Sequence, residues 1–261
     1  MIGLVCGTGN FPKEIITNLN KIKKKFIIIN LTKKKITKND YILSIGQYGK
    51  FLKVLKQNNC KEIIFAGKID RPQLMNIKFD KEGLKLLPQL VKIFKSGDYK
   101  ILNFIINAFN RNKIKVISHT KYCKYITLYK NVTKAKPSLN NYRDLKVAIK
   151  LINSLNTNDL GQGIIVENHR VMMVECAFGT DVMLKNFEKQ KIKKVYPILI
   201  KTTKKYQDLI IDLPTIGLET IKNSIKAGLK GIFVKKGKNV FLQRDKCIKL
   251  ADKHNFFISV F

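Results

Sequence analysis

The sequence has no apolar run long enough to cross a membrane. Its longest apolar stretches, such as residues 26–29 and 195–200, fall far short of the roughly 20 residues that a membrane-spanning helix needs. The N-terminal sequence MIGLVCGTGN also lacks the basic region and the apolar region of a secretory signal. We therefore expect a cytoplasmic protein whose residues Leu4, Val5 and Cys6 form a strand.

Cysteine and histidine are too sparse and too scattered for a soft-metal centre. The five cysteines are widely spaced without a CxxC pair, and the three histidines lack the close spacing of a zinc site. An odd number of cysteines in mostly apolar surroundings suits reduced thiols in a cytoplasm. The sequence predicts neither a disulfide framework nor a zinc site.

Acidic residues are also scarce, because 18 Asp and Glu stand against 51 Lys and Arg, which gives a formal net charge of +33. This balance points to nucleic acid, anionic lipid or an anionic substrate as a partner. The joint abundance of lysine, asparagine and isoleucine is also what an AT-rich genome encodes, so codon usage is an alternative source of the charge. The lysines spread over every segment instead of clustering with aromatic residues, and this argues against nucleic-acid binding.

Short apolar runs alternate with helical patterns through the first half of the chain. Strands are expected at 2–6, 26–30, 41–45, 62–66 and 114–118, and helices from about Pro12 and at 48–57, 83–95 and 98–112. This alternation predicts an α/β fold in which an N-terminal Rossmann-like domain contains a parallel sheet.

A polar stretch, NVTKAKPSLN, interrupts the pattern and contains Pro137, so the sequence predicts domains 1–134 and 135–261. The second domain is expected to be a distinct α/β domain. Its predicted elements are a helix at 141–155, hairpin arms at 163–167 and 171–176, a helix from about Thr180, a strand at 195–201, a helix at 217–227, a strand at 231–234, and a last helix and strand.

Three loops of the first half follow predicted strands, where open α/β sheets bind ligands. The loop from Gly7 to Pro12 opens the first helix, whose free N–H groups can hold a phosphate, although a tight structural turn explains the same residues. Pro12 in place of a third glycine and Asn30 at the end of the second strand argue against a dinucleotide. The loop at 46–50 repeats the pattern after the third strand, and the loop at 65–72 lies at the end of the fourth strand.

Two basic residues strengthen the case for anion binding in these loops. Lys50 lies at a helix N-terminus, from which basic residues are usually repelled. Arg71 offers the planar bidentate geometry that suits a phosphate. The candidate substrate contacts of this half are Gly7, Gly9, Asn10, Gln47, Gly49, Lys50, Lys68 and Arg71.

Carboxylates are concentrated in one part of the second half. Six of the 18 acidic residues lie there, namely Glu175, Asp181, Glu188, Asp208, Asp212 and Glu219. Such a concentration in a basic chain indicates a divalent cation, since Mg²⁺ is bound by one or two carboxylates and by substrate phosphates. Thr180 and Asp181 are equally explained as a helix N-cap and a first-turn acid. Asp212 closes the apolar run 209–211 just before a turn, where a strand would present a ligand.

Several segments, taken together and in order, resemble the LpxI-type UDP-2,3-diacylglucosamine diphosphatases over nearly the whole chain. They are GLVCGTGNFP, GQYGK, FAGKIDRPQL, GLKLLP with the following GD, DLGQGIIVE, ECAFGTDVML, QDLIIDLPTIGLETI and AGLKGI. The resemblance implies hydrolysis of UDP-2,3-diacylglucosamine to UMP and 2,3-diacylglucosamine 1-phosphate (lipid X) in lipid A biosynthesis. It further implies that water attacks the α-phosphorus with the help of Mg²⁺.

The resemblance places the family's essential aspartate on Asp212, which would help to hold the cation or orient the attacking water. Our supporting metal ligands are Asp181, Glu175 and Asp208, and our substrate contacts in this half are Gln162, Thr180 and Thr215.

Two positions depart from the KPxQDxRxD pattern of the family, because Lys205 and Ile210 replace its proline and arginine. Lys201 or Lys204 would then steady the phosphate in place of that arginine. A lipid-binding or scaffold protein derived from these enzymes is the alternative that the missing arginine raises.

The expected partners follow from this interpretation. The substrate is a nucleotide-activated diacylated glucosamine, and the positive surface favours peripheral contact with the anionic cytoplasmic face of the inner membrane. No nucleic-acid partner is expected, and the sequence leaves assembly into a homo-oligomer open.

Overall fold

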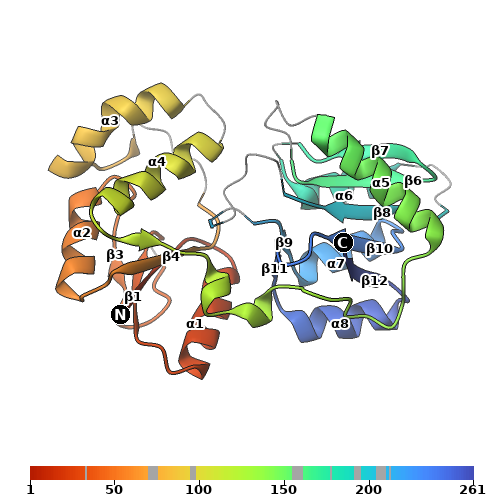
Figure 1. Cartoon of the computed structure of the whole chain (residues 1–261), viewed down its shortest axis with the longest axis horizontal. Coiled ribbons are helices and arrows are strands. Elements are labelled where there is room, and N and C mark those ends of the chain that lie inside the picture. The colour runs from red at the N-terminus through yellow and green to blue at the C-terminus, as the bar shows by residue number, and fades with distance from the viewer. Residues whose placement is uncertain are drawn as a thin grey trace. The chain divides into compact units, whose positions relative to one another are not determined.

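The computed structural model describes residues 1–32, 34–69, 76–94, 98–154, 161–176, 178–190, 195–203, 210–211 and 213–261. The chain divides into two compact units, Met1–Lys124 and Tyr125–Phe261, each with its own sheet and helices (Figure 1).

The division between the units lies earlier than the boundary predicted near residue 135. The segment before Pro137 belongs to the second unit because its side chains are built into that unit's core. Leu128 is fully buried in the core, and the Asn239 side-chain amide donates to its carbonyl oxygen at 3.2 Å. The hydroxyl of Thr133 accepts from the N–H of Ile258 at 2.8 Å. Polar composition alone therefore did not mark the linker.

The first unit contains a five-stranded sheet in the order β3-β2-β1-β4-β5, and all of its pairings are parallel. The strands are β1 (Ile2–Cys6), β2 (Phe26–Asn30), β3 (Tyr41–Ile42), β4 (Glu62–Ala66) and β5 (Lys115–Val116). This order confirms the predicted Rossmann-like sheet. β3 and β5 are two residues long, shorter than their apolar runs indicated.

The helices that accompany this sheet in the described part of the unit are α1 (Phe11–Lys21), α2 (Tyr48–Gln57), α3 (Lys81–Phe94) and α4 (Asp98–Arg111), with 3₁₀ turns at His119–Lys121 and Lys124–Ile126. α1 begins with Pro12 in its first turn and buries Ile15 and Leu19, four residues apart on one face. The rings of Tyr48, Phe65 and Phe109 join α2, β4 and α4 in one aromatic cluster.

The strand order reverses around β1, which pairs with β2 on one side and β4 on the other. The connections that leave these strands therefore diverge at the carboxyl edge of the sheet. In open α/β sheets, such a reversal point is where ligands bind.

The second unit contains a mixed sheet in the order β12-β10-β8-β6-β7 and a separate parallel pair, β9 with β11. The strands are β6 (Gly163–Glu167), β7 (Arg170–Val174), β8 (Ile198–Lys201), β9 (Thr215–Ile216), β10 (Gly231–Val234), β11 (Val240–Phe241) and β12 (Phe257–Val260). β8, β10 and β12 are parallel, whereas β6 runs antiparallel to both β8 and β7. The predicted second α/β domain is confirmed.

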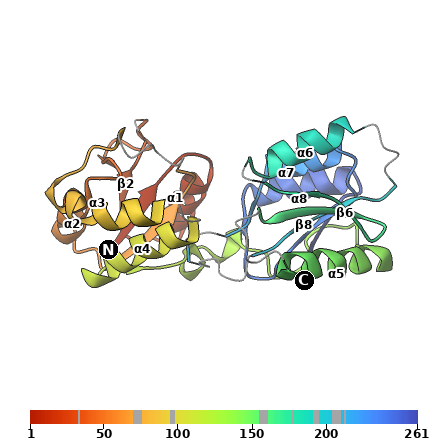
Figure 2. The same ribbon diagram turned by 90° about the horizontal axis from the view of Figure 1, so that it is seen from above.

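Helices cover both faces of this sheet (Figure 2), with α5 (Leu139–Ser154) on one face and α6 (Thr180–Lys189), α7 (Leu218–Lys226) and α8 (Arg244–Lys253) on the other. Alternate residues of β8 enter the two cores, since Ile198 and Ile200 pack with the α5 residues and Leu199 packs with α6, α7 and α8. This two-sided burial fixes the register of β8 and hence the position of Lys201 at its carboxyl end.

Candidate functional site

The loops that follow β1 and β4 are joined to each other at the point where the strand order reverses. The backbone N–H of Thr8 donates to the Lys68 carbonyl oxygen at 2.8 Å, and the N–H of Lys68 donates back at 2.9 Å. A Cβ on Gly7 would collide with that Lys68 carbonyl, and Gly67 has a φ of +95° beside Thr8. Close packing between the two loops thus accounts for Gly7.

Gly9 and Asn10 lie differently, because both are exposed at the start of α1. Gly9 has a φ of +96°, and a Cβ there would meet nothing within 4 Å. Asn10 is the N-cap of α1, but its side chain makes no capping hydrogen bond. A helix N-terminus without a side-chain cap can offer its N–H groups to a ligand. Lys68 is exposed on the neighbouring loop.

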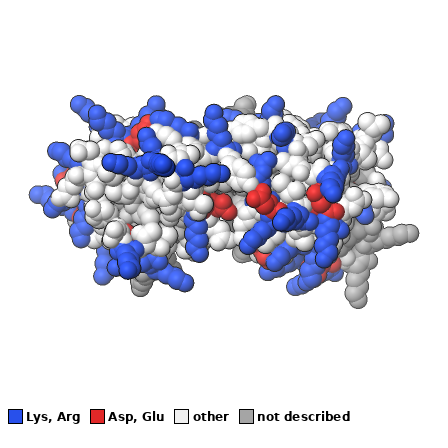
Figure 3. Space-filling view, turned by 90° about the horizontal axis from the view of Figure 1, so that it is seen from below, with Lys and Arg blue, Asp and Glu red and all other residues white. Residues whose placement is uncertain are grey.

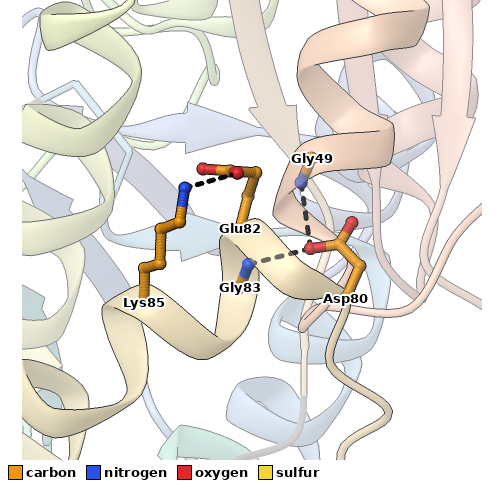
Figure 4. Close-up of polar contacts among 5 residues, drawn as sticks. All are labelled: Gly49, Asp80, Glu82, Gly83 and Lys85. Carbon is orange, nitrogen blue, oxygen red and sulfur yellow. Dashed lines mark hydrogen bonds and ion pairs between the residues drawn. The ribbon is translucent and has the colours of Figure 1, made fainter.

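At the N-terminus of α2, the protein supplies an anion of its own (Figure 4). The carboxylate of Asp80 accepts from the N–H groups of Gly49 at 3.1 Å and Lys50 at 2.9 Å. It also accepts from the N–H of Gly83 at 2.8 Å, in the first turn of α3. Burial alone would raise the pKa of Asp80, but these three backbone donors hold it below its usual value. Asp80 therefore caps two helices at once.

The N–H groups of Gly49 and Lys50, which were predicted to bind a substrate anion, therefore donate to the side chain of Asp80. The predicted contact Gln47 precedes α2, and its side-chain oxygen accepts from the N–H of Ser44 at 2.9 Å. Sequence reasoning missed Asp80, although an acidic residue three positions before Gly83 is a recognisable N-cap signal.

In the second unit, the structure brings together three of the predicted residues around a buried lysine. The hydroxyl of Thr180 donates to the Glu175 carboxylate at 2.9 Å. The Lys201 ammonium donates to the Thr180 hydroxyl at 2.8 Å and to the Thr215 carbonyl oxygen at 3.1 Å. We call these four residues the Glu175–Lys201 cluster.

Four separate segments build the Glu175–Lys201 cluster. Glu175 follows β7, Thr180 begins α6, Lys201 ends β8, and Thr215 begins β9. Lys201 is 6% exposed, and a charge that is buried to this extent is stable only when it is hydrogen-bonded to polar partners. β8 and β10 are parallel, and their carboxyl edge is again where α/β sheets bind ligands.

The glycines of the DLGQG segment are explained by the Glu175 side chain. A Cβ on Gly163 would lie 2.5 Å from a Glu175 carboxylate oxygen, and a Cβ on Gly161 would collide with its methylene groups. The backbone fixes the same contact, since Gly161 N–H donates to the Glu175 carbonyl oxygen at 2.8 Å. The carbonyl of Gln162 accepts from the N–H of Thr202 at 3.0 Å, which ties this segment to the end of β8.

Asp181 lies against α7, since its carboxylate accepts from the Asn223 side chain at 3.2 Å. Across the described residues, no three His, Cys, Asp or Glu side chains gather into a metal site. Asp208 and Asp212 lie outside the described residues, as do Arg71, Lys204 and Lys205. Ile210 and Ile211 form a turn rather than the end of a strand, and Ile210 is 37% exposed.

The helices and the charged surface of the described residues bear on the possible partners of the chain. Among the described residues, no helix combines the length and apolarity that a membrane span requires. Lys and Arg side chains are spread over the face drawn in Figure 3 instead of gathering in one patch.

Comparisons with known proteins cover nearly the whole chain. The family model described as "LpxI N-terminal domain" matches residues 1–126, and the one described as "LpxI C-terminal domain" matches residues 129–259. A curated relative, UDP-2,3-diacylglucosamine pyrophosphatase LpxI of Caulobacter vibrioides, is 28% identical over 268 aligned residues. The alignment covers 98% of this chain and 96% of that protein.

Proposed function

Because this chain belongs to the LpxI family along both of its domains, we propose that it is a UDP-2,3-diacylglucosamine diphosphatase of lipid A biosynthesis. It would hydrolyse the pyrophosphate of its substrate to UMP and 2,3-diacylglucosamine 1-phosphate. The observation that carries this proposal is the match to a pyrophosphatase over nearly the full length of both chains. The resemblance inferred from the ordered sequence segments is confirmed.

The Glu175–Lys201 cluster supplies what pyrophosphate cleavage requires. Phosphoryl transfer depends mainly on positioning and on neutralising charge at the phosphate oxygens, and a covalent nucleophile is not needed. Lys201 places a positive charge at the carboxyl edge of the second sheet, between the hydroxyl of Thr180 and the backbone of Thr215. In this proposal, Lys201 steadies a phosphate, the role that the missing arginine at position 210 leaves open.

Mg²⁺ fits the chemistry of the donors near this cluster. Mg²⁺ prefers oxygen ligands and is bound by one or two carboxylates together with substrate phosphates. Glu175 contributes one carboxylate, fixed in place by Thr180, and Asp212 and Asp208 would contribute from the segment next to Thr215. When bound, the cation would neutralise the pyrophosphate. Asp181 would have to give up its hydrogen bond to Asn223 in order to join.

Asp212 is the residue that we propose to be essential, either holding the cation or orienting the water that attacks the α-phosphorus. In the first unit, the exposed start of α1 at Gly9 and Asn10, with Lys68 beside it, is suited to a further phosphate or to the nucleotide. The two acyl chains of the proposed substrate and the positive charge of this chain favour an anionic membrane surface, and we propose a cytoplasmic location with peripheral membrane contact.

The first test is UMP release from UDP-2,3-diacylglucosamine in detergent micelles, with Mg²⁺ or with EDTA, by the wild type and Asp212→Ala. We expect turnover that requires the metal, loss of at least about a hundredfold in the variant, and an unchanged circular dichroism spectrum. Asp245→Ala, an exposed aspartate on α8, serves as the matched control and should retain activity.

The scaffold interpretation makes a different forecast for the same experiment. A scaffold would bind the lipid without releasing UMP, both with Mg²⁺ and without it. Ile210→Arg is then the informative variant, because Ile210 is a partly exposed apolar residue at a position where the family has arginine. Activity gained only by Ile210→Arg would show that this chain had lost the reaction.

A further inference from the structure

Helix α3 is strongly amphipathic, and part of its apolar surface is exposed while its other apolar residues are half-buried. Its sequence, KEGLKLLPQLVKIF, carries leucine, valine, isoleucine and phenylalanine at helical spacing, yet Gly83 is the residue that it buries fully. α1, by contrast, buries Ile15 and Leu19. On α3, Leu84 is 53% exposed and Val91 is 52% exposed. A helix of this pattern normally turns its apolar face to a core.

The exposed apolar residues of α3 form one stripe. Leu84, Pro88 and Val91 are spaced four and three residues apart, so their side chains follow each other along one side of the helix. All three are exposed. α3 packs beside α2 and α4 (Figures 1 and 2). The exposure of these three residues places the stripe on the solvent-facing side of α3.

Positive charge runs along the same helix. Lys81, Lys85 and Lys92 are exposed and occupy positions next to the stripe. Glu82 pairs with Lys85 at 2.7 Å, so Lys81 and Lys92 supply most of the net charge of this face. An apolar stripe bordered by lysines is the pattern of helices that lie in the interface of a bilayer containing anionic lipids.

α3 begins at the edge of the sheet that carries the candidate ligand loops. A Cβ on Gly83 would collide with the carbonyl of Gly46, and the Asp80 N–H donates to that carbonyl oxygen at 3.3 Å. Gly46 follows β3, so the first turn of α3 lies at the carboxyl edge of the parallel sheet. Gly9 and Lys68 are at the same edge.

We propose that α3 is the surface by which this protein docks on an anionic phospholipid membrane, with Leu84, Pro88 and Val91 in the interface and Lys81 and Lys92 at the lipid headgroups. Docking in this orientation would bring the ligand-binding edge of the first unit to the bilayer that supplies a two-chain lipid. The delivery of a lipid substrate to this edge rests on the proposed function, whereas membrane docking itself does not.

The experiment is co-sedimentation of the full-length protein with sucrose-loaded vesicles of phosphatidylcholine, with or without a third of phosphatidylglycerol, and without substrate. The test variant is Leu84→Ser with Val91→Ser. The matched control, Leu139→Ser with Val171→Ser, makes the same two changes at exposed positions of the second unit. A second pair compares Lys81→Gln with Lys92→Gln against Lys146→Gln with Lys249→Gln, all exposed lysines.

We expect the wild type to bind the anionic vesicles, the Leu84 and Val91 variant to bind about tenfold more weakly, and the Leu139 and Val171 control to bind like the wild type. The Lys81 and Lys92 variant should weaken binding severalfold more than its control, in a salt-dependent way. Equal losses in test and control variants would overturn the proposal, because binding would then reflect general charge. The proposal would also be overturned if the wild type did not bind the vesicles, even if the stripe mediated self-association.

UMP release in detergent micelles keeps this inference separate from the proposed function. The α3 variants should retain turnover there, because micelles deliver the substrate without docking. A wild type that binds vesicles but releases no UMP would refute the proposed function and leave docking standing.

Discussion

The sharpest test of the site is Lys201→Met, which removes the charge of the buried lysine and retains most of its length. Lys201 is 6% exposed and donates to the Thr180 hydroxyl and to the Thr215 carbonyl oxygen. If this ammonium is present to steady a phosphate, the substitution should damage the reaction far more than it damages the fold.

The two effects have different sizes. Hydrogen bonds from a charged donor are each worth about 1.5 to 3 kcal/mol, but burying the ammonium costs several kcal/mol, so the two terms largely offset each other. We expect the free energy of unfolding to fall by about 1 to 2 kcal/mol. Removing a preorganised positive group from a phosphoryl-transfer site costs about a hundredfold or more in turnover. The loss of kcat/KM should therefore exceed the loss of stability.

The assays are urea unfolding followed by circular dichroism and UMP release in detergent micelles. Lys235→Met, an exposed lysine just beyond β10, is the matched control and should change neither quantity. Thr180→Val keeps the side-chain shape but removes the hydroxyl between Glu175 and Lys201, and should reduce activity about tenfold. If Lys201→Met stays folded and retains activity within threefold, Lys201 is a structural residue and the reasoning is wrong.

Two further predictions concern the first unit and are measured by urea unfolding. Asp80→Ala removes the acceptor that caps α2 and α3 and should lower the free energy of unfolding by about 1 to 3 kcal/mol. Glu82→Ala breaks an exposed ion pair with Lys85 and should lower it by less than about 1 kcal/mol. Equal losses in the two variants would show that the shared cap is unimportant. The pKa of Asp80 is lower in the folded protein than in the unfolded chain. Asp80 therefore adds to the free energy of unfolding at any pH above its pKa in the unfolded chain, and this stabilisation is lost as the pH falls through its pKa in the folded protein. Burial lowers the pKa of His119 to about 4 from its ordinary 6.5. Below pH 6.5 the unfolded chain binds a proton at His119 that the folded protein does not, so the free energy of unfolding falls by up to roughly 3 kcal/mol toward pH 4. His119→Gln should flatten this pH dependence, and an unchanged slope would contradict the assignment.

The sequence predicted the elements that periodic burial determines. Strand 231–234 was placed at its observed bounds, because Gly231–Val234 is an uninterrupted apolar run flanked by polar residues. β3 was expected to extend to residue 45 but ends at Ile42, because Ser44 N–H donates to the Gln47 side chain and the chain turns into α2. Apolar composition therefore gives the position of a strand, and local side-chain hydrogen bonds decide where it ends.

Contacts between residues far apart in the sequence could not be predicted in this way. Lys50 at a helix N-terminus indicated a bound anion, and the anion that the structure places there is Asp80, 30 residues later in the chain. The sequence shows that the N–H groups at a helix N-terminus need an acceptor, but it does not show whether that acceptor is a ligand or a side chain. The same ambiguity applies to Gly7, which is required because the loops after β1 and β4 pack against each other.

The Glu175–Lys201 cluster shows how far the sequence can locate a site. The sequence predicts Glu175 as a carboxylate ligand in an acid-poor chain and Thr180 and Thr215 as substrate contacts. Their meeting point is Lys201, whose position follows from the two-sided burial of Ile198, Leu199 and Ile200 in β8. Packing on both faces of that strand leaves one place for its last side chain, at the carboxyl edge of the sheet. The hydrophobic core therefore positions the charged group on which the proposed chemistry depends.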